Sequence, residues 1–357
     1  MKRPGAKAAF IAEMTGESVL TDSLGRTLDY LRVSITDRCN LRCLYCMPPS
    51  GVQWKPHNDM LTFEEILRII KIMAELGLRK IRVTGGEPLL RRGISSFIKN
   101  LKAVPNIEKV RLTTNGLLLN AYLKEAETLG DNSLPDGINI SLDALDSGRY
   151  RRLTRGAFSG DESSAAGPEM ILSIIDRLIE KKINVKINCV PLRAVNEEEI
   201  SCVAALAKNK NIAVRFIELM PLGSSASFLP VTGNETAALI EKAFGKLIPF
   251  SGIEGSGPAV YYSLENFTGK IGFINPVTHG FCETCNRLRL TSEGFLKLCL
   301  SDDLGVDLRE LIRNGAANDE LSRVIIEAAA KKPHFHTLSG IYGNSENHTC
   351  GMFKIGG

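Results

Sequence analysis

The chain has 357 residues, of which 44% are hydrophobic and 24% are charged, and its formal net charge is +4. This composition is typical of a globular protein and excludes a wholly disordered or fibrous chain. Lysine and arginine are dispersed along the sequence, which argues against a nucleic-acid surface and favours a site for one anionic ligand. The length allows one large α/β domain or two smaller ones.

The first 25 residues predict neither a signal peptide nor a membrane anchor. Basic residues occur there without a following apolar segment, and acidic residues appear after Thr15. Nowhere does the chain reach the roughly 18 uncharged apolar residues of a membrane-spanning helix. We therefore expect a soluble, cytoplasmic protein that binds neither membranes nor nucleic acid.

Three cysteines follow a first predicted strand at residues 30–35. They are Cys39, Cys43 and Cys46, with the spacing C-x3-C-x2-C. Thiolates are the usual ligands of iron–sulfur clusters, and three of them leave one iron of a four-iron cubane open to another ligand. A zinc site would need a fourth ligand, for which the next candidate is His57 in a polar loop. A disulfide is disfavoured because the chain has no secretory signal.

Strands and helices alternate over the next part of the chain. Apolar runs predict strands at residues 80–84, 109–113, 137–142, 183–190 and 212–217. Helical periodicity predicts helices at residues 62–77, 93–103, 118–129, 169–181, 197–208 and 235–244. With the first strand they form six strand-then-helix units, which imply parallel strands joined by right-handed crossovers.

The positions of the polar segments favour a barrel over an open, doubly wound sheet. These segments follow the predicted strands, at residues 39–46, 85–87, 113–116, 141–143 and 218–220. Barrel active sites are built at that end of the strands, whereas open sheets gather ligand residues at one switch point. We predict a partial (βα)6 TIM-type barrel at residues 26–250, after an N-terminal extension at residues 1–25. No G-x-G-x-x-G or P-loop motif supports nucleotide binding through such loops.

Two segments rich in small and polar residues interrupt the pattern. Residues 156–169 predict an exposed loop, and residues 251–258 predict a domain boundary. We take residues 251–332 as a C-terminal α+β extension, with strands at 261–264 and 270–274 and helices at 304–314 and 319–331. Residues 333–357 form a polar tail, for which a frayed end is the default expectation.

A second group of three cysteines lies in this extension. They are Cys282, Cys285 and Cys299, with the spacing C-x2-C-x13-C. A second cluster with an open iron is the sharper hypothesis, although His279 could complete a zinc site. Between these cysteines, Arg287 and Arg289 would share one side of a strand, where two guanidinium groups could grip a polyphosphate. A solvated basic face is the ordinary alternative for an isolated R-x-R.

Together, the first cysteine motif, Gly85-Gly86-Glu87-Pro88 after a second strand, and the later C-x2-C-x13-C resemble the radical S-adenosylmethionine superfamily. More narrowly, the chain resembles the molybdenum cofactor biosynthesis protein A family, the GTP 3′,8-cyclases. The resemblance runs from about Leu31 to the terminal Gly356-Gly357. The second cysteine group, the R-x-R motif and the Gly-Gly end specify the narrower family.

This resemblance implies a lyase that converts GTP to 3′,8-cyclo-7,8-dihydro-GTP in the first step of molybdenum cofactor biosynthesis. The implied cofactors are two [4Fe-4S] clusters and S-adenosyl-L-methionine. Reductive cleavage of S-adenosylmethionine would yield a 5′-deoxyadenosyl radical that removes the ribose 3′ hydrogen, after which the substrate radical attacks C8 of guanine. The product would pass to cyclic pyranopterin monophosphate synthase, and a flavodoxin- or ferredoxin-type reductant would supply the electron.

The resemblance also implies roles for individual residues. The first cysteine group would hold the cluster that binds S-adenosylmethionine, and the second would hold a cluster that touches guanine. Contacts to S-adenosylmethionine would come from Tyr45, Gly86, Ser141 and Met220. Contacts to GTP would come from Arg32, Arg82, Thr113, Lys186, Arg287 and Arg289. The residues expected to act in catalysis are Arg287, Arg289, Gly356 and Gly357, because the tail would enter the active site.

Some features depart from the family pattern or leave alternatives open. The segments at 131–135 and 156–169 are longer than expected, and no match is assigned to His334, His336, His348 and Cys350. A peptide-modifying radical S-adenosylmethionine enzyme with an auxiliary cluster is an alternative, as is a non-catalytic iron–sulfur protein. The expected assembly is a monomer or a homodimer.

Overall fold

Six parallel strands in chain order form the centre of the fold. They are β1 (Tyr30–Ser34), β2 (Lys80–Thr84), β3 (Lys109–Thr114), β4 (Gly137–Ser141), β5 (Asn184–Cys189) and β6 (Ala213–Ile217). The computed structural model describes residues 19–156, 167–252, 257–336 and 338. Each of these strands matches a predicted strand to within about two residues, a margin ordinary for element ends.

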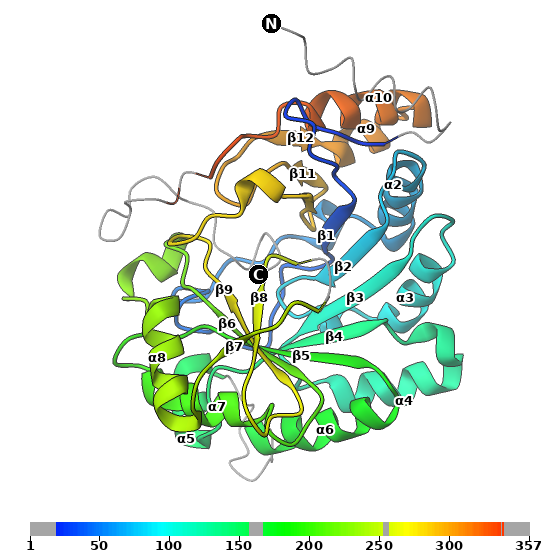
Figure 1. The fold of residues 1–357 in the computed structure, drawn as a ribbon. Coiled ribbons are helices and arrows are strands. Elements are labelled where there is room, and N and C mark those ends of the chain that lie inside the picture. Colours follow the sequence, from blue (N-terminus) through cyan, green and yellow to red (C-terminus); the bar gives the residue numbers. More distant parts are fainter. Residues whose placement is uncertain (1–18, 157–166, 253–256, 337, 339–357) are drawn as a thin grey trace, which may run out of the picture.

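Helices cover the outer side of these strands (Figure 1). They are α2 (Phe63–Glu75), α3 (Ile94–Lys102), α4 (Leu119–Leu129), α5 (Ser147–Thr154), α6 (Pro168–Glu180), α7 (Ile200–Ala205) and α8 (Gly233–Phe244). The first begins at the predicted capping box, where the Thr62 hydroxyl accepts a hydrogen bond from the Glu65 amide and the Glu65 carboxylate accepts one from the Thr62 amide. In the described part of the chain, no helix combines the length and apolarity needed to cross a bilayer.

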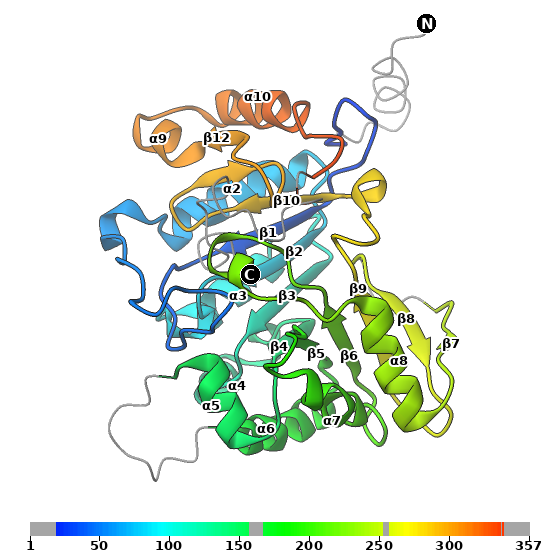
Figure 2. The same ribbon diagram turned by 90° about the vertical axis from the view of Figure 1, so that its left-hand side faces the viewer.

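The C-terminal part of the chain extends the same sheet at both sides. Strand β9 (Lys270–Ile274) pairs in parallel with β6, and β10 (Arg287–Leu290) pairs in parallel with β1. The outer strands are antiparallel and are β7 (Ile248–Pro249), β8 (Val260–Ser263), β11 (Phe295–Lys297) and β12 (Gly305–Asp307). The resulting twelve-stranded sheet has the order β12-β11-β10-β1-β2-β3-β4-β5-β6-β9-β8-β7. It curves as a partial barrel (Figure 2), which confirms the predicted fold class.

The structure corrects two sequence expectations. Helix α5 was not predicted, because its sequence, SGRYRRLT, is too polar to show apolar periodicity; the Asp146 carboxylate caps it by accepting from the Arg149 amide. The helix predicted at residues 304–314 is wrong at its start, because Gly305–Asp307 pairs with β11 as a strand. Helix α9 (Leu308–Arg313) follows only after Asp307 caps it. The loop predicted at residues 156–169 lies largely outside the described residues, and its end forms the first turn of α6.

Helices α9 and α10 (Asn318–Ala329) pack beside α2 (Figure 1). The Arg313 guanidinium fastens this contact by donating hydrogen bonds to the carbonyls of Asn58 and Met60 and by pairing with the Glu65 carboxylate. The hydrogen bonds from the Arg313 guanidinium to these backbone carbonyls therefore hold the C-terminal helices against the barrel.

Phe97 of α3 makes an apolar contact that holds α3 against α2. It is 1% exposed, and its ring stacks on Phe63 of α2 with 4.2 Å between ring centroids. We predict that Phe97→Ala lowers the free energy of unfolding by about 3–5 kcal/mol, because burial is lost and a cavity remains. Ile326→Ala, at a position on α10 that is 46% exposed, should change it by less than about 0.5 kcal/mol. Equal losses in urea unfolding of the two variants would contradict this packing.

Candidate active site

A cavity of about 320 Å³ lies inside the curved sheet, at the carboxyl ends of the parallel strands. Residues at or just beyond the ends of β2 to β6 line it, namely Thr84, Thr114, Ser141, Val190 and Ile217. Because parallel strands end on the same side, loops far apart in the sequence meet there. Both cysteine groups also line this cavity.

The first cysteine group sits in a loop that leaves β1 and rests on the end of α5. The Arg42 amide donates to the Thr154 carbonyl over 2.8 Å, and the Leu44 amide donates to the Leu153 carbonyl over 2.9 Å. Burial raises the pKa of the Cys39 thiol to about 12 and that of Cys43 well above its ordinary value. A bound cation would reverse this effect, since metal coordination deprotonates a thiol.

The glycine pair after β2 lies directly against the segment that precedes Cys39. The Gly86 amide donates to the Thr36 carbonyl over 2.7 Å, and the Glu87 amide donates to the Arg38 carbonyl over the same distance. A Cβ atom on Gly86 would lie 2.3 Å from the Arg38 carbonyl oxygen, so no other residue fits without moving the backbone. The glycine therefore leaves bare backbone facing the cavity.

Glu87 is a buried carboxylate that joins three loops of the site. It accepts hydrogen bonds from the Leu89 amide, the Thr114 hydroxyl and the Asn115 amide, at 2.7 to 3.0 Å. The Asn115 side chain in turn donates to Asn40 Oδ1 over 2.8 Å, which reaches the first cysteine loop. Burial raises the pKa of Glu87 to about 7, although the three donors oppose this shift.

Tyr45 is held against the cavity by a second buried carboxylate. Its hydroxyl donates to Asp143 Oδ2 over 2.7 Å, and the Val190 amide donates to the other oxygen over 2.8 Å. Burial raises the pKa of Asp143 to about 6, against the effect of both hydrogen bonds. The loop after β6, which carries Met220, is closed by the hydroxyl of Ser225, which accepts from the Leu222 amide over 2.7 Å.

Four arginines lie side by side on neighbouring strands inside the barrel. The parallel register aligns Arg289 of β10, Arg32 of β1, Arg82 of β2 and Arg111 of β3. Burial, and then repulsion by Arg287, lower the pKa of Arg289 to about 10. Arg82 donates to the Tyr30 hydroxyl, and to Thr113 Oγ1 over 3.4 Å. Burial alone would raise the pKa of Tyr30, but the positive charges around it, of which Arg82 contributes most, lower it to about 8.

The second cysteine group approaches the same cavity from the extension. A 3-10 turn at Cys282–Thr284 is closed by the Cys285 amide, which donates to the Cys282 carbonyl over 3.1 Å. The Arg287 guanidinium lies 3.7 Å from Cys285 Sγ and packs over the Phe281 ring at 4.7 Å. Burial opposes ionisation of Cys285, but Arg287 and Lys332 outweigh it and lower the pKa of this thiol.

The donor chemistry of both groups fits iron–sulfur clusters. Within residues 19–156, 167–252, 257–336 and 338, no three His, Cys, Asp or Glu side chains converge closely enough to hold a single metal ion. Thiolates of a cubane bind different irons and are therefore spread more widely than ligands of one zinc ion. His279 is exposed and pairs with the Thr278 hydroxyl at 3.2 Å.

The structure brings together most of the residues implied by the family resemblance. Those that line the cavity are the six cysteines of the two groups, Tyr45, Gly86, Ser141, Met220, Arg32, Arg82, Thr113, Arg287 and Arg289. Lys186 is not among the lining residues; it is buried on β5, and its ammonium group donates to the Tyr261 hydroxyl over 3.1 Å. Gly356, Gly357, His348 and Cys350 lie outside the described residues.

Sequence reasoning missed several polar residues of the cavity. Arg215 of β6 lines it and donates to Asn188 Oδ1 over 3.0 Å, and Tyr30 supports Arg82. Arg111 belongs to the arginine row without lining the main cavity. The available signal was alternation within strands, since Arg82 in β2, Arg111 in β3 and Arg215 in β6 each stand at an inward position between apolar neighbours.

Two family models match consecutive parts of the chain. Residues 33–207 match the Radical SAM superfamily, and residues 212–338 match Molybdenum Cofactor Synthesis C. The first part contains the first cysteine group and strands β2 to β5, and the second contains the second cysteine group. The two cysteine groups thus fall in separately recognised regions.

Known proteins resemble the chain over most of its length. GTP 3′,8-cyclase of Clostridium perfringens (strain SM101 / Type A) is 40% identical over 338 residues, covering 95% of this chain and 100% of the relative. That of Pelotomaculum thermopropionicum is 42% identical over 322 residues, covering 89% and 95%. The crystal structure of Streptococcus suis SuiB matches with a TM-score of 0.55 at 13% identity, covering 95% of this chain and 70% of that one, and supports the fold alone. By the extent and identity of its curated relatives, the chain belongs to the GTP 3′,8-cyclase family of radical S-adenosylmethionine enzymes.

Proposed function

We propose that this GTP 3′,8-cyclase carries out its reaction within the single cavity described above, with separate tasks for the two cysteine groups. The observation that carries the proposal is that both groups and the inner arginines Arg32, Arg82 and Arg289 line that one cavity. Such an arrangement lets a substrate about the size of GTP touch both groups. The alternatives, a peptide-modifying enzyme or an electron carrier, give the arginine row no ligand.

The first cysteine group would hold the iron–sulfur cluster that binds S-adenosylmethionine. When bound, these two cofactors supply the one-electron chemistry that starts the reaction. Tyr45 would lie along the adenine, and its bond to Asp143 fixes the ring in place. The backbone of Gly86, which lines the cavity, would receive the methionine amino group, and the contact with the Arg38 carbonyl leaves no room for a side chain at this position. Ser141 and Met220 would contact the remaining parts of the cofactor.

Arg32, Arg82 and Arg289, the members of the arginine row that line the cavity, would bind the triphosphate of GTP. Buried cations placed side by side repel one another, and an anion with several charges relieves that repulsion. Thr113 bonds to Arg82 and would help to orient it toward the phosphates. Lys186 contacts Tyr261 rather than the cavity, so a role in substrate binding would require its side chain to move.

The second cysteine group would hold a second [4Fe-4S] cluster whose open iron meets the guanine. Arg287 and Arg289 share one side of β10 and would bind substrate beside that cluster. The chain would thereby hold the ribose near the first site and the guanine near the second, which brings C3′ and C8 together while excluding water. The product would pass to cyclic pyranopterin monophosphate synthase, and a flavodoxin- or ferredoxin-type protein would be the reductant.

Isotope transfer tests the reaction directly. We predict that the anaerobically reconstituted chain, given S-adenosylmethionine, dithionite and GTP deuterated at C3′, transfers deuterium to 5′-deoxyadenosine, because that hydrogen is the one removed. Chromatography and mass spectrometry should also find a product with the formula of GTP and a new retention time. Deuterium-free 5′-deoxyadenosine in the presence of GTP would contradict the proposed abstraction.

Single cysteine variants test the division of tasks. Cys43→Ser should abolish cleavage of S-adenosylmethionine, whereas Cys285→Ser should keep some uncoupled cleavage and lose the cyclised product. Iron analysis should find about eight irons in the wild-type chain and fewer in both variants. Cys202→Ser, at an exposed position on α7, is the matched control and should change none of these values. Zinc without iron in the wild-type protein, or equal loss of cleavage in both variants, would rule out the assignment.

The terminal glycines provide a further test, although they lie outside the described residues. Deleting Gly356-Gly357 should lower turnover and leave the iron content unchanged, because only residues without side chains would fit beside both ligands. An unchanged rate under saturating GTP would show that the end of the chain takes no part in the reaction.

A further inference from the structure

Arg26 is a buried cation in the segment that precedes β1. An antiparallel bridge between Thr21 and Thr27 closes this segment into a small turn. The Asp22 side chain is fully buried, pairs with the Arg26 guanidinium, and accepts a hydrogen bond from the Arg26 amide over 3.0 Å. The carboxylate therefore balances the charge and fixes the direction in which the guanidinium points.

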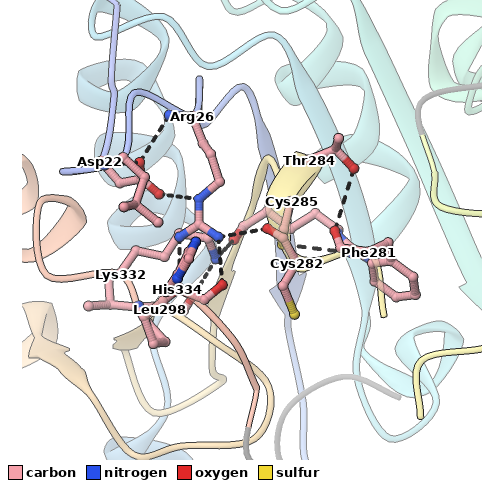
Figure 3. Close-up of polar contacts among 12 residues, drawn as sticks. Asp22, Arg26, Phe281, Cys282, Thr284, Cys285, Leu298, Lys332 and His334 are labelled. Atoms are coloured by element: carbon pink, nitrogen blue, oxygen red, sulfur yellow. Dashed lines mark hydrogen bonds and ion pairs between the residues drawn. The ribbon is translucent and has the colours of Figure 1, made fainter. Parts of the chain in front are cut away.

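The Arg26 guanidinium points at two other segments (Figure 3). It donates to the Cys282 carbonyl over 2.7 Å, in the turn that carries two cysteines of the second group. It also donates to the carbonyls of Pro333 and His334, over 2.7 and 3.3 Å, where the chain leaves α10. One side chain thus joins the N-terminal segment, the second cysteine group and the start of the C-terminal tail.

Lys332 holds the other half of the second cysteine group. It is 4% exposed, and its ammonium group donates to the Arg287 carbonyl over 2.8 Å and to the Leu298 carbonyl over 2.5 Å. Leu298 directly precedes Cys299, so this contact fixes the third cysteine relative to the other two. The ammonium group also lies close enough to Cys285 and Cys299 for their thiolates to attract it.

The tail beyond Lys332 continues along the second cysteine group into the cavity. His336 Nε2 lies 2.6 Å from the Pro276 carbonyl, and its Nδ1 accepts a hydrogen bond from the Leu338 amide over 3.2 Å. Both contacts are satisfied by one neutral tautomer, with the proton on Nε2. Leu338 is buried and lines the cavity. The sequence expectation of a frayed tail is therefore wrong at Pro333, His336 and Leu338, which are partly or fully buried, whereas the side chains of His334 and Phe335 are exposed.

We propose that Asp22, Arg26 and Lys332, here called the cationic brace, position the second cysteine group and the start of the tail for turnover. The inference rests on the proposed function, because it takes the second cysteine group to hold a cluster that binds substrate. The brace residues are positioning residues, since they contact the backbone around that group. Charged donors on carbonyls form stronger hydrogen bonds than neutral ones, and Arg26 and Lys332 make five such bonds, to the carbonyls of Cys282, Arg287, Leu298, Pro333 and His334.

Backbone hydrogen bonds to the end of α5 anchor the first cysteine group, whereas the donors of the brace go to carbonyls around the second group and at the start of the tail. Loss of the brace should therefore leave cleavage of S-adenosylmethionine in place and misplace the substrate. The distinguishing quantity is the ratio of 5′-deoxyadenosine to cyclised product, which a general loss of stability would not change.

The test compares Arg26→Gln and Lys332→Met with the matched control Arg313→Gln. Arg313 also holds two backbone carbonyls and a carboxylate, but its partners are Asn58, Met60 and Glu65, at the contact of α9 with α2 and outside both cysteine groups. Each brace variant should raise the ratio about tenfold, because a small misplacement of the substrate costs a large factor in rate. A protease should also cut the chain at residues 333–336 faster, as followed by mass spectrometry. Arg313→Gln should lower the melting temperature and leave the ratio at the wild-type value.

Two further variants distinguish a failure of the brace from a failure of the second cluster. Arg26→Lys keeps the charge but loses the planar set of donors, so its ratio should lie between those of the wild type and Arg26→Gln. If Arg26→Gln does not fold, a ratio of Arg26→Lys above the wild-type value supports the brace. In a chain carrying Cys39→Ser, Cys43→Ser and Cys46→Ser, about four irons should remain. Absence of that iron would overturn the second cluster itself. Iron present with an unchanged ratio and unchanged proteolysis in both brace variants would overturn the brace alone.

Discussion

The alignment of like charges inside the barrel is the constraint on which the site depends. Arg289, Arg32, Arg82 and Arg111 are register neighbours on four adjacent strands. Neighbouring strands lie only about 4.8 Å apart, where each pair of like charges repels by on the order of a few kcal/mol. Tyr30 offsets part of this through its polar hydroxyl and lowered pKa, and a polyphosphate would offset the rest. An anion bound there would relieve part of this repulsion, so we expect the pairing of these strands to favour a highly charged ligand.

Different kinds of interaction hold the two cysteine groups in place. Backbone hydrogen bonds to α5 and a glycine that tolerates no Cβ hold the first group. The side chains of Arg26 and Lys332 hold the second, which comes from a segment more than two hundred residues later in the chain. Hydrogen bonds between backbone groups form with many different side chains, whereas the contacts of the brace are lost when one of a few residues changes. The second group is therefore the more easily altered of the two.

Much of the barrel could be predicted because each of its units is local. Apolar runs and the capping box at Thr62 specify strand and helix positions, and the cysteine spacings indicate shared ligands only within each group. The register of β10 against β1 could not be predicted, because it joins segments about 250 residues apart and depends on the whole fold. Helix α5 and strand β12 were missed because their short sequences carry little periodicity. Asp22 was assigned to the N-terminal extension and Arg26 was given no role, since nothing local ties them to carbonyls at residues 282 and 333.

The parallel pairing of β10 with β1 also limits how the sequence can change in length. Arg287 and Arg289 face the cavity only because their strand keeps its alternation relative to Cys285. Inserting or deleting one residue between Cys285 and Arg287 would turn both guanidinium groups to the opposite face of the sheet. Substitutions in this stretch remove one contact at a time, but a single-residue insertion or deletion removes both arginines from the cavity at once. The segment should therefore accept exchanges of side chains far more readily than any change in its length.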